Sequence, residues 1–209
     1  MATYPNGQEI WDYLMILIGN EYGVAGLMGN LYAESGLLPF RKQGDSDSAN
    51  NYPISHEYSA DVTDGTITET TFVNDSIGYG LAQWTSSSRK QGLYDITVGS
   101  GYGVDNLQRQ LAYIQQELEG SYSPTLTVLV NATSVRQASD RVLHYYELPA
   151  DQSTAVEIYR ANLGIDIYNT YSGSTPQPPI PPQPIRRKSE RRPLYFYITK
   201  RMRYKKGIL

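Results

Sequence analysis

A proline-rich segment near the C-terminus limits which part of this chain can fold as one unit. Six prolines fall between Gly173 and Pro184, and a segment of this composition forms extended polyproline II and cannot pack into a core. The residues before it are numerous enough to bury one sizeable core. We therefore expect a folded domain at 1–172, a semi-rigid linker at 173–185 and a separate tail at 186–209.

Charge is distributed unevenly along the chain, although the net charge is only −3. Residues 186–209 hold ten of the 18 Lys and Arg residues and one acid, which leaves eight cations against 20 acids in residues 1–185. The tail is too short for a core of its own, so we expect it to be disordered. It would attract anionic wall polymers or membrane, without specific binding of nucleic acid. A truncated or frame-altered remnant is an equally good interpretation of the tail.

Composition excludes several classes of site. Cysteine is absent, and two histidines, His56 and His144, cannot build a histidine-rich metal centre, so we expect no metal and no cofactor. Neither histidine has a Ser or Cys partner in a nucleophile motif, which leaves peptidase and amidase chemistry without support.

No apolar run is long enough to cross a bilayer. The first residues lack a secretory pattern, so we expect release by another route or action inside a particle.

Apolar residues recur at helical spacing through most of residues 1–172. The clearest stripe follows the cap candidate Asp105 and consists of Leu107, Leu111, Ile114 and Leu118. Comparable patterns cover 8–19, 23–34, 134–146 and 154–171. Between residues 38 and 76 the helical period disappears, and Thr, Val, Tyr, Asp and Gly accumulate around Thr63–Ile67. The sequence thus predicts a mainly helical α+β domain with a small β-hairpin or irregular lobe.

The second helical pattern carries a carboxyl on its apolar face. Glu34 follows Val24, Leu27 and Leu31 at helical spacing, so part of its side chain should enter the core. Gly36 is the expected helix stop, which places Glu34 near the negative end of the helix dipole. Burial and the dipole both disfavour the charged carboxyl, as suits a general acid that protonates a glycosidic oxygen. A structural ion pair at the helix end is the alternative.

Residues 78–85 read Gly-Tyr-Gly-Leu-Ala-Gln-Trp-Thr, and the two glycines allow a tight approach of the backbone. Aromatic rings pack on the apolar faces of sugars, and an amide can hydrogen-bond to hydroxyl or acetamido groups. We therefore expect Tyr79, Gln83 and Trp84 to line a saccharide groove. A turn with Trp84 in the core is the alternative, and taken alone this segment favours that alternative.

Together, residues 29–37 and 78–85 resemble the phage tail lysozyme and endolysin family of the goose-type-like lysozyme superfamily. The resemblance continues through 88–94, 110–114 and 145–151 and covers about residues 8 to 172. It implies a lysozyme-like fold and cleavage of the β-1,4 bond between N-acetylmuramic acid and N-acetylglucosamine in bacterial peptidoglycan. Glu34 matches the Glu that ends the Ala-Glu-Ser-Gly helix of the family, so the resemblance implies that it is the catalytic acid.

Glycosidases commonly pair the acid with a second carboxylate, and the resemblance implies that it would come from the lobe after the helix. Among seven acids there, we favour Asp75 as a catalytic residue because it directly precedes the Gly78–Gln83 segment. An Asx turn ahead of Ser76 is an equally good alternative. We expect Asn30 and Glu147 to bind substrate, although Glu147 would also suit an arginine pair or a helix end. Many relatives work with one carboxyl.

These expectations describe a monomeric, phage-encoded hydrolase whose partner is bacterial peptidoglycan. It would wait in the host cytoplasm before release to the cell wall, or would act from a virion tail. Three alternatives stay open. They are a lytic transglycosylase of the same fold, a non-catalytic saccharide-binding tail protein, and a membrane-disrupting peptide formed by the basic tail.

Overall fold

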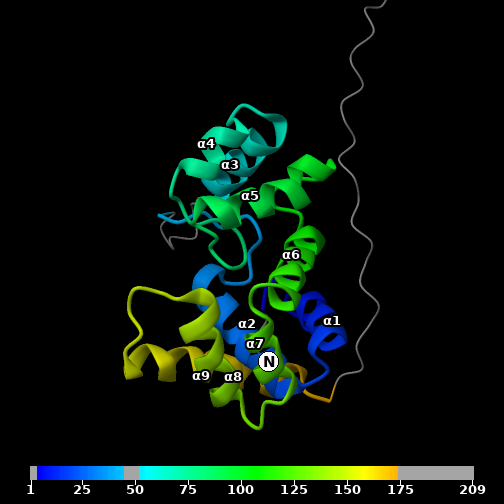
Figure 1. Cartoon of the computed structure of the whole chain (residues 1–209), viewed down its shortest axis with the longest axis vertical. Helices are drawn as coiled ribbons and strands as arrows, with labels where there is room; N and C mark the ends of the chain where they lie inside the picture. Colours follow the sequence, from blue (N-terminus) through cyan, green and yellow to red (C-terminus); the bar gives the residue numbers. More distant parts are fainter. Residues whose placement is uncertain (1–3, 45–51, 174–209) are drawn as a thin grey trace, which may run out of the picture.

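The computed structural model describes residues 4–44 and 52–173, and this part of the chain is mainly helical (Figure 1). The predictions for the linker and the basic tail, residues 174–209, lie outside the described residues. In chain order the helices are α1 (Gly7–Ile18), α2 (Glu21–Ser35), α3 (Tyr52–Asp64), α4 (Glu69–Asn74), α5 (Ser87–Ile96), α6 (Leu107–Glu119), α7 (Ser123–Val130), α8 (Val135–Val142) and α9 (Thr154–Tyr171). A 3₁₀ turn, η1 (Val98–Ser100), follows α5, and a π-helical turn, η2 (Leu143–Glu147), follows α8.

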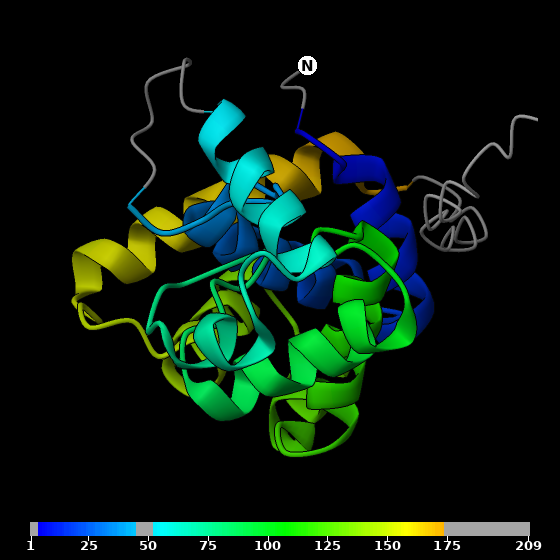
Figure 2. The same cartoon turned by 90° about the horizontal axis from the view of Figure 1, so that it is seen from above.

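The α2 helix is the centre of one group of helices and packs against α1, α7, α8 and α9 (Figures 1 and 2). It begins at the cap residue Asn20, whose side chain accepts hydrogen bonds from Tyr22 N at 2.9 Å and Gly23 N at 3.3 Å. Such a cap satisfies amide groups that have no partner within the helix. The helix ends at Gly36, which adopts a left-handed conformation with φ 66°. The predicted stop is confirmed, and Glu34 lies in the last turn.

The α2 and α9 helices approach each other closely at Gly29. A Cβ atom at Gly29 would lie 2.6 Å from Gly164 N and 2.7 Å from Arg160 O. Both are backbone atoms of α9, so they could move away only if the helix itself shifted. Because Arg160 also sends its side chain toward Glu34, this contact positions the charged groups of the candidate site as well as the two helices.

We expect Gly29→Ala to lower the free energy of unfolding by about 1–3 kcal/mol, because a methyl group would be forced into a close-packed interface. Urea unfolding followed by circular dichroism measures the change. Gly99→Ala is the matched control, since a Cβ there meets only Tyr94 O at 3.5 Å, an ordinary contact. The control should change stability by less than about 0.5 kcal/mol. Equal stability of Gly29→Ala and the wild type would contradict the close approach.

The α3, α4 and α5 helices form a second group, at the top of Figure 1. The predicted β-hairpin around Thr63–Ile67 is wrong, because Thr63 and Asp64 are the last residues of α3. Asp64 Oδ1 accepts a hydrogen bond from Thr66 N at 2.9 Å, and Thr68 Oγ1 caps α4. Thr and Asp are favoured in caps and turns, whereas the prediction took the threonines as a sign of a strand.

Pairing of extended backbone is limited to two isolated antiparallel bridges within the described residues. Tyr79 pairs with Lys42 in one of them and with Trp84 in the other. The second bridge closes the turn of the Gly-Tyr-Gly-Leu-Ala-Gln-Trp segment, with Tyr79 N and Trp84 N each donating to the other residue's carbonyl, at 3.2 and 3.0 Å. Where the structure describes the chain, its β-structure is therefore this turn and its contact with residue 42.

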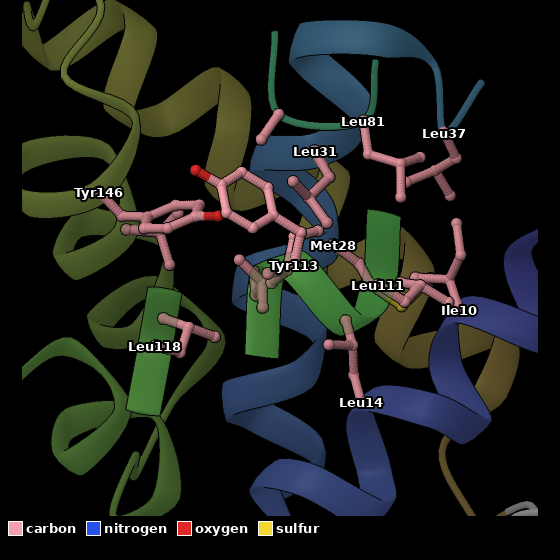
Figure 3. Packing of buried hydrophobic residues seen from close by; sticks show 14 of the residues in the cluster. Ile10, Leu14, Met28, Leu31, Leu37, Leu81, Leu111, Tyr113, Leu118 and Tyr146 are labelled. Atoms are coloured by element: carbon pink, nitrogen blue, oxygen red, sulfur yellow. The ribbon is translucent and has the colours of Figure 1, made fainter. Parts of the chain in front are cut away.

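One hydrophobic core joins the two groups. Figure 3 shows side chains of α1, α2 and α6 meeting, and the buried ones include Ile10, Met28, Leu31, Leu111 and Leu118. The predicted stripe on α6 is confirmed at its three later positions, which are fully buried, whereas Leu107 is only partly buried. The cap of α6 is Asn106, whose side chain accepts a hydrogen bond from Arg109 N at 3.0 Å, and not the predicted Asp105.

Among the described residues, none of the helices is both long and apolar enough to span a membrane.

Candidate active site

A groove of about 940 Å³ lies where the two groups of helices meet. Its walls come from segments far apart in the sequence. Glu34 comes from the end of α2, Gln83 from the segment before α5, Arg89 from α5, Glu147 from η2 and Tyr159 from α9. The volume is at the upper end of the range for ligand pockets. The fold thus brings charged, amide and aromatic side chains to one hollow.

Glu34 lies in the wall of the groove with its side chain 19% exposed. Arg160 Nη2 lies 2.6 Å from Glu34 Oε1, and the Arg160 side chain is 9% exposed. The ion pair was the alternative to a free carboxyl at this helix end. Glu34 is therefore held by a mostly buried arginine as well as lying in the last turn of α2.

Asn30 lies beneath the ion pair. It is fully buried, and its Nδ2 donates to Gly26 O at 2.9 Å and to Ser139 Oγ at 3.1 Å. Arg160 Nη1 donates to Asn30 Oδ1 at 3.3 Å. The expectation that Asn30 contacts substrate is therefore corrected: it has no surface in the groove, and it holds the arginine toward Glu34.

The guanidinium of Arg89 lines the groove. Arg89 Nε and Nη2 donate to the two oxygens of Glu117 at 2.6 and 2.9 Å. Glu117 Oε2 also accepts from Trp84 Nε1 at 2.9 Å and from Tyr146 OH at 2.7 Å. Burial opposes the charge of Arg89, but the hydrogen bonds to Glu117 outweigh it and raise the pKa of the guanidinium. Arg89 is therefore a fixed cation in the groove wall.

Tyr79 and Trp84 are core residues. Both are fully buried and neither lines the groove. The Tyr79 hydroxyl lies 2.6 Å from Ser59 Oγ, and the Trp84 indole donates to Glu117. This burial leaves no ring face for a sugar to stack on, which corrects the expectation that these two residues position a saccharide. The alternative, a turn with Trp84 in the core, is confirmed.

Gln83 is the one predicted residue of this segment that lines the groove. Its Nε2 donates to Arg41 O at 3.1 Å and to Gly80 O at 3.0 Å. The turn itself is held from below by Gln110, a buried residue of α6 whose Oε1 accepts from Leu81 N at 2.9 Å. A Cβ at Gly80 would lie 2.7 Å from that same oxygen, which explains why the turn requires glycine there.

Asp75 lies outside the residues that line the groove. It forms an ion pair with the buried Lys90 and accepts a hydrogen bond from Tyr58 OH. Its Oδ1 also accepts from Ile77 N at 2.8 Å, which is the Asx turn given as the alternative. The expectation of a catalytic role for Asp75 is corrected, because the side chain is committed to holding the loop ahead of Gly78.

Glu147 is the second carboxyl that the structure brings to the groove. It ends η2, and the next residue, Leu148, has a left-handed conformation with φ 51°. Glu147 Oε1 is buried and has no hydrogen-bond partner in the part of the chain that the structure describes. Burial, and then the charge of Glu34, raise the pKa of Glu147 well above its usual value.

Sequence reasoning assigned no role to Arg160 or Arg89. A signal for Arg160 was present, because Arg160, Gly164 and Ile167 recur at helical spacing on the face of α9 that becomes buried. An arginine on a buried face requires a carboxylate partner. For Arg89 no comparable pattern exists, since α5 mixes exposed, partly buried and buried residues.

The groove also exposes aromatic surface that the sequence did not single out. Tyr32, Tyr122, Tyr146 and Tyr159 all line it. Tyr146 is fully buried, whereas Tyr159 is 57% exposed and lies one residue before Arg160. Tyr159 therefore offers a ring face to a ligand in the groove.

Comparison with known families identifies the chain. The family described as phage tail lysozyme matches residues 5–171, which include every groove-lining residue named above. A comparison with curated proteins gives no match. The match spans every helix that the structure describes, from α1 to α9. The chain therefore belongs to the phage tail lysozyme family, whose lysozyme-like function acts on peptidoglycan.

Proposed function

We propose that this chain is a phage-encoded muramidase that cleaves the β-1,4 bond between N-acetylmuramic acid and N-acetylglucosamine in peptidoglycan. The observation that carries the proposal is the placement of Glu34, a carboxyl in the wall of a large groove at the end of a helix. Family membership supports the same residue, because Glu34 is the glutamate of the Ala-Glu-Ser-Gly segment at residues 33–36.

In the proposed reaction, Glu34 donates a proton to the glycosidic oxygen as the bond to the anomeric carbon breaks. The sugar passes through an oxocarbenium-like transition state, and a water molecule then adds to the anomeric carbon, with its released proton returning to the Glu34 carboxylate. Donation leaves a carboxylate on Glu34. Arg160, 2.6 Å away, stabilises that anion, and hydrogen bonding to Asn30 keeps the guanidinium in place.

Groove residues other than the carboxyls would hold the glycan. Gln83 presents an amide whose oxygen can accept hydrogen bonds from hydroxyl or acetamido groups. Tyr159 and Tyr122 offer ring faces that can pack on the apolar side of a sugar. In this proposal the two rings pack on the saccharide, which is the role that the sequence predicted for Tyr79 and Trp84.

We expect Tyr159→Ala to raise KM for a soluble peptidoglycan oligomer about fivefold while kcat stays unchanged. An aromatic contact contributes about 1 kcal/mol, and its loss from ground state and transition state alike appears in KM. The matched control is Tyr145→Ala, because Tyr145 is 56% exposed but does not line the groove. A fall in kcat with KM unchanged, or the same effect in the control, would contradict this assignment.

The identity of the products tests the proposed chemistry. Mass spectrometry of purified cell walls digested with the full chain should show new reducing ends on N-acetylmuramic acid. Capture of the intermediate by the 6-hydroxyl of the muramic acid, as in a lytic transglycosylase, would instead leave 1,6-anhydro ends. New peptide termini on intact glycan strands would overturn the glycosidase assignment.

A further inference from the structure

Four polar side chains on α8, η2 and α9 form a continuous hydrogen-bonded cluster. Arg136 Nε donates to both carboxylate oxygens of Asp140 at 2.7 Å, and Arg136 Nη2 donates to Glu157 Oε2 at 2.6 Å. The other oxygen of Glu157, Oε1, lies 2.9 Å from His144 Nε2. None of the four residues lines the groove, so the candidate active site has no use for this cluster.

The same histidine also contacts the segment that follows η2. His144 Nδ1 lies 2.9 Å from Gln152 Oε1. Residues 148–150 of this segment form part of the groove wall. In the part of the chain that the structure describes, the other hydrogen bonds of residues 149–152 stay within residues 149–153. The contact with His144 therefore connects the groove wall to the cluster.

Both ring nitrogens of His144 face oxygen atoms. An imidazolium can donate from both nitrogens, whereas a neutral imidazole donates from one and presents a lone pair at the other. The carboxylate of Glu157 is the stronger acceptor, so a neutral ring keeps its N–H on that side and turns a lone pair toward Gln152. Rotation of the Gln152 amide would not repair this, because its Nε2 donates to Pro149 O at 3.2 Å. Loss of the proton therefore removes one hydrogen bond from the segment.

Charged groups lie near His144 on each element around it. They are Arg136, Asp140 and Arg141 on α8, Asp151 in the segment after η2, and Glu157 on α9. The two cations are both bound elsewhere. Arg136 is hydrogen-bonded to carboxylates, and Arg141 Nε donates to Thr125 Oγ1 at 3.2 Å. The surroundings of the ring thus suit a positive charge on it.

The pKa of His144 agrees with this geometry. The hydrogen bonds to Gln152 and then to Glu157 raise the pKa above the ordinary histidine value of 6.5; burial opposes them, and the charges of Glu157 and Asp140 add to the rise. A raised pKa means that the folded contacts bind the proton. Their stabilising effect is therefore fully present below about pH 6.5 and is lost as the pH rises through the raised pKa.

We propose that His144 is a pH-sensitive latch for the groove wall. The protonated ring holds residues 148–152 to α9 by hydrogen-bonding to Gln152 and Glu157 together, and loss of the proton at higher pH releases the segment. Residues 148–150 then no longer keep one fixed position in the wall, so a glycan binds less tightly. The effect on glycan binding rests on the proposed glycosidase function, whereas the latch itself does not.

NMR tests the latch without measuring activity. The chain has two histidines, His56 and His144, so carbon-13 spectra of the full chain labelled at the histidine rings are simple, and His144→Asn assigns them. We expect the pKa of His144 to fall in Gln152→Ala, which removes the acceptor, and to rise in Gln152→Glu, which adds a negative charge. A purely structural role would not move the pKa in opposite directions. An unchanged pKa of His144 in both variants would overturn the latch.

The pH dependence of KM for a soluble peptidoglycan oligomer tests the effect on the groove. In the full-length wild type, KM should rise about three- to fivefold as the pH passes through the pKa of His144, the usual effect of one hydrogen bond. Gln152→Ala should have the higher KM at every pH. In Gln152→Glu the rise should move to higher pH, because the added charge holds the proton longer.

A control variant and two contrary outcomes complete this test. Gln116→Ala is the control, because Gln116 is exposed on α6 and does not line the groove, and its KM profile should match that of the wild type. A rise in KM that persists in Gln152→Ala, or a wild-type KM that stays constant while His144 titrates, would overturn the proposal. If none of the proteins cleaves peptidoglycan, the proposed function fails, and the shifts in the His144 pKa decide the latch.

Discussion

Glu34→Gln should reduce the release of reducing ends from purified cell walls by about 10²- to 10⁴-fold, the usual contribution of a general acid. Glutamine has nearly the same shape as glutamate but has no carboxyl proton to donate. Its oxygen can still accept from Arg160, which lies 2.6 Å from Glu34 Oε1 in the wild type. The fold and the groove should therefore persist, and the loss should appear in kcat.

The Glu34→Gln assay requires a control variant that also loses one carboxyl group, but away from the groove. Glu119→Gln makes the same chemical change at an exposed position away from the groove, so it should clear walls at the wild-type rate. Circular dichroism of all three proteins shows whether they are folded. Equal clearing by Glu34→Gln and the wild type, or no clearing by either, would refute the assignment of Glu34 as the acid.

Glu117→Gln should produce the largest loss of stability, about 3–5 kcal/mol in the free energy of unfolding. Glu117 is buried and accepts hydrogen bonds from Arg89, Trp84 and Tyr146. With the charge removed, Arg89 becomes a largely buried cation without its partner. An amide at this position also turns one of the two accepting oxygens into a donor, so donors face each other.

Thermal unfolding and urea titration measure this loss. For a domain of this size, about 3 kcal/mol corresponds to a fall in Tm of roughly 6–12 °C. Glu119→Gln, two residues later on the same helix, is again the control, and it should stay within about 0.5 kcal/mol of the wild type. A Glu117 variant as stable as this control would show that the network around Arg89 contributes nothing to the fold.

The sequence predicted the element that carries Glu34 because local signals there agree with one another. The apolar spacing of α2 and the glycine at its end both point to the same helix, and the structure has it from Glu21 to Ser35. In residues 52–74 local signals conflicted. Threonines that cap helix α4 and close the turn before it looked like strand residues, because one residue type serves both purposes.

The partners of Glu34 depend on packing that no local pattern encodes. Arg160 is 126 positions away in the chain and reaches Glu34 only because Gly29 and Gly164 let α2 and α9 approach. Glu147 is the last residue of a π-helical turn, and the left-handed residue Leu148 follows it. Neither feature has a reliable signal in the sequence. Tyr79 and Trp84 look like ligand-binding aromatics, yet the same side chains are large enough to fill a core, and here they do.

The most direct measurement is a structure of the full-length Glu34→Gln variant with a peptidoglycan oligomer bound. The account predicts that the oligomer lies in the groove, with one glycosidic oxygen about 2.6–3.2 Å from the side chain at position 34 and a sugar ring against Tyr159. An oligomer bound along another face, or one whose glycosidic oxygens all lie beyond reach of position 34, would contradict it.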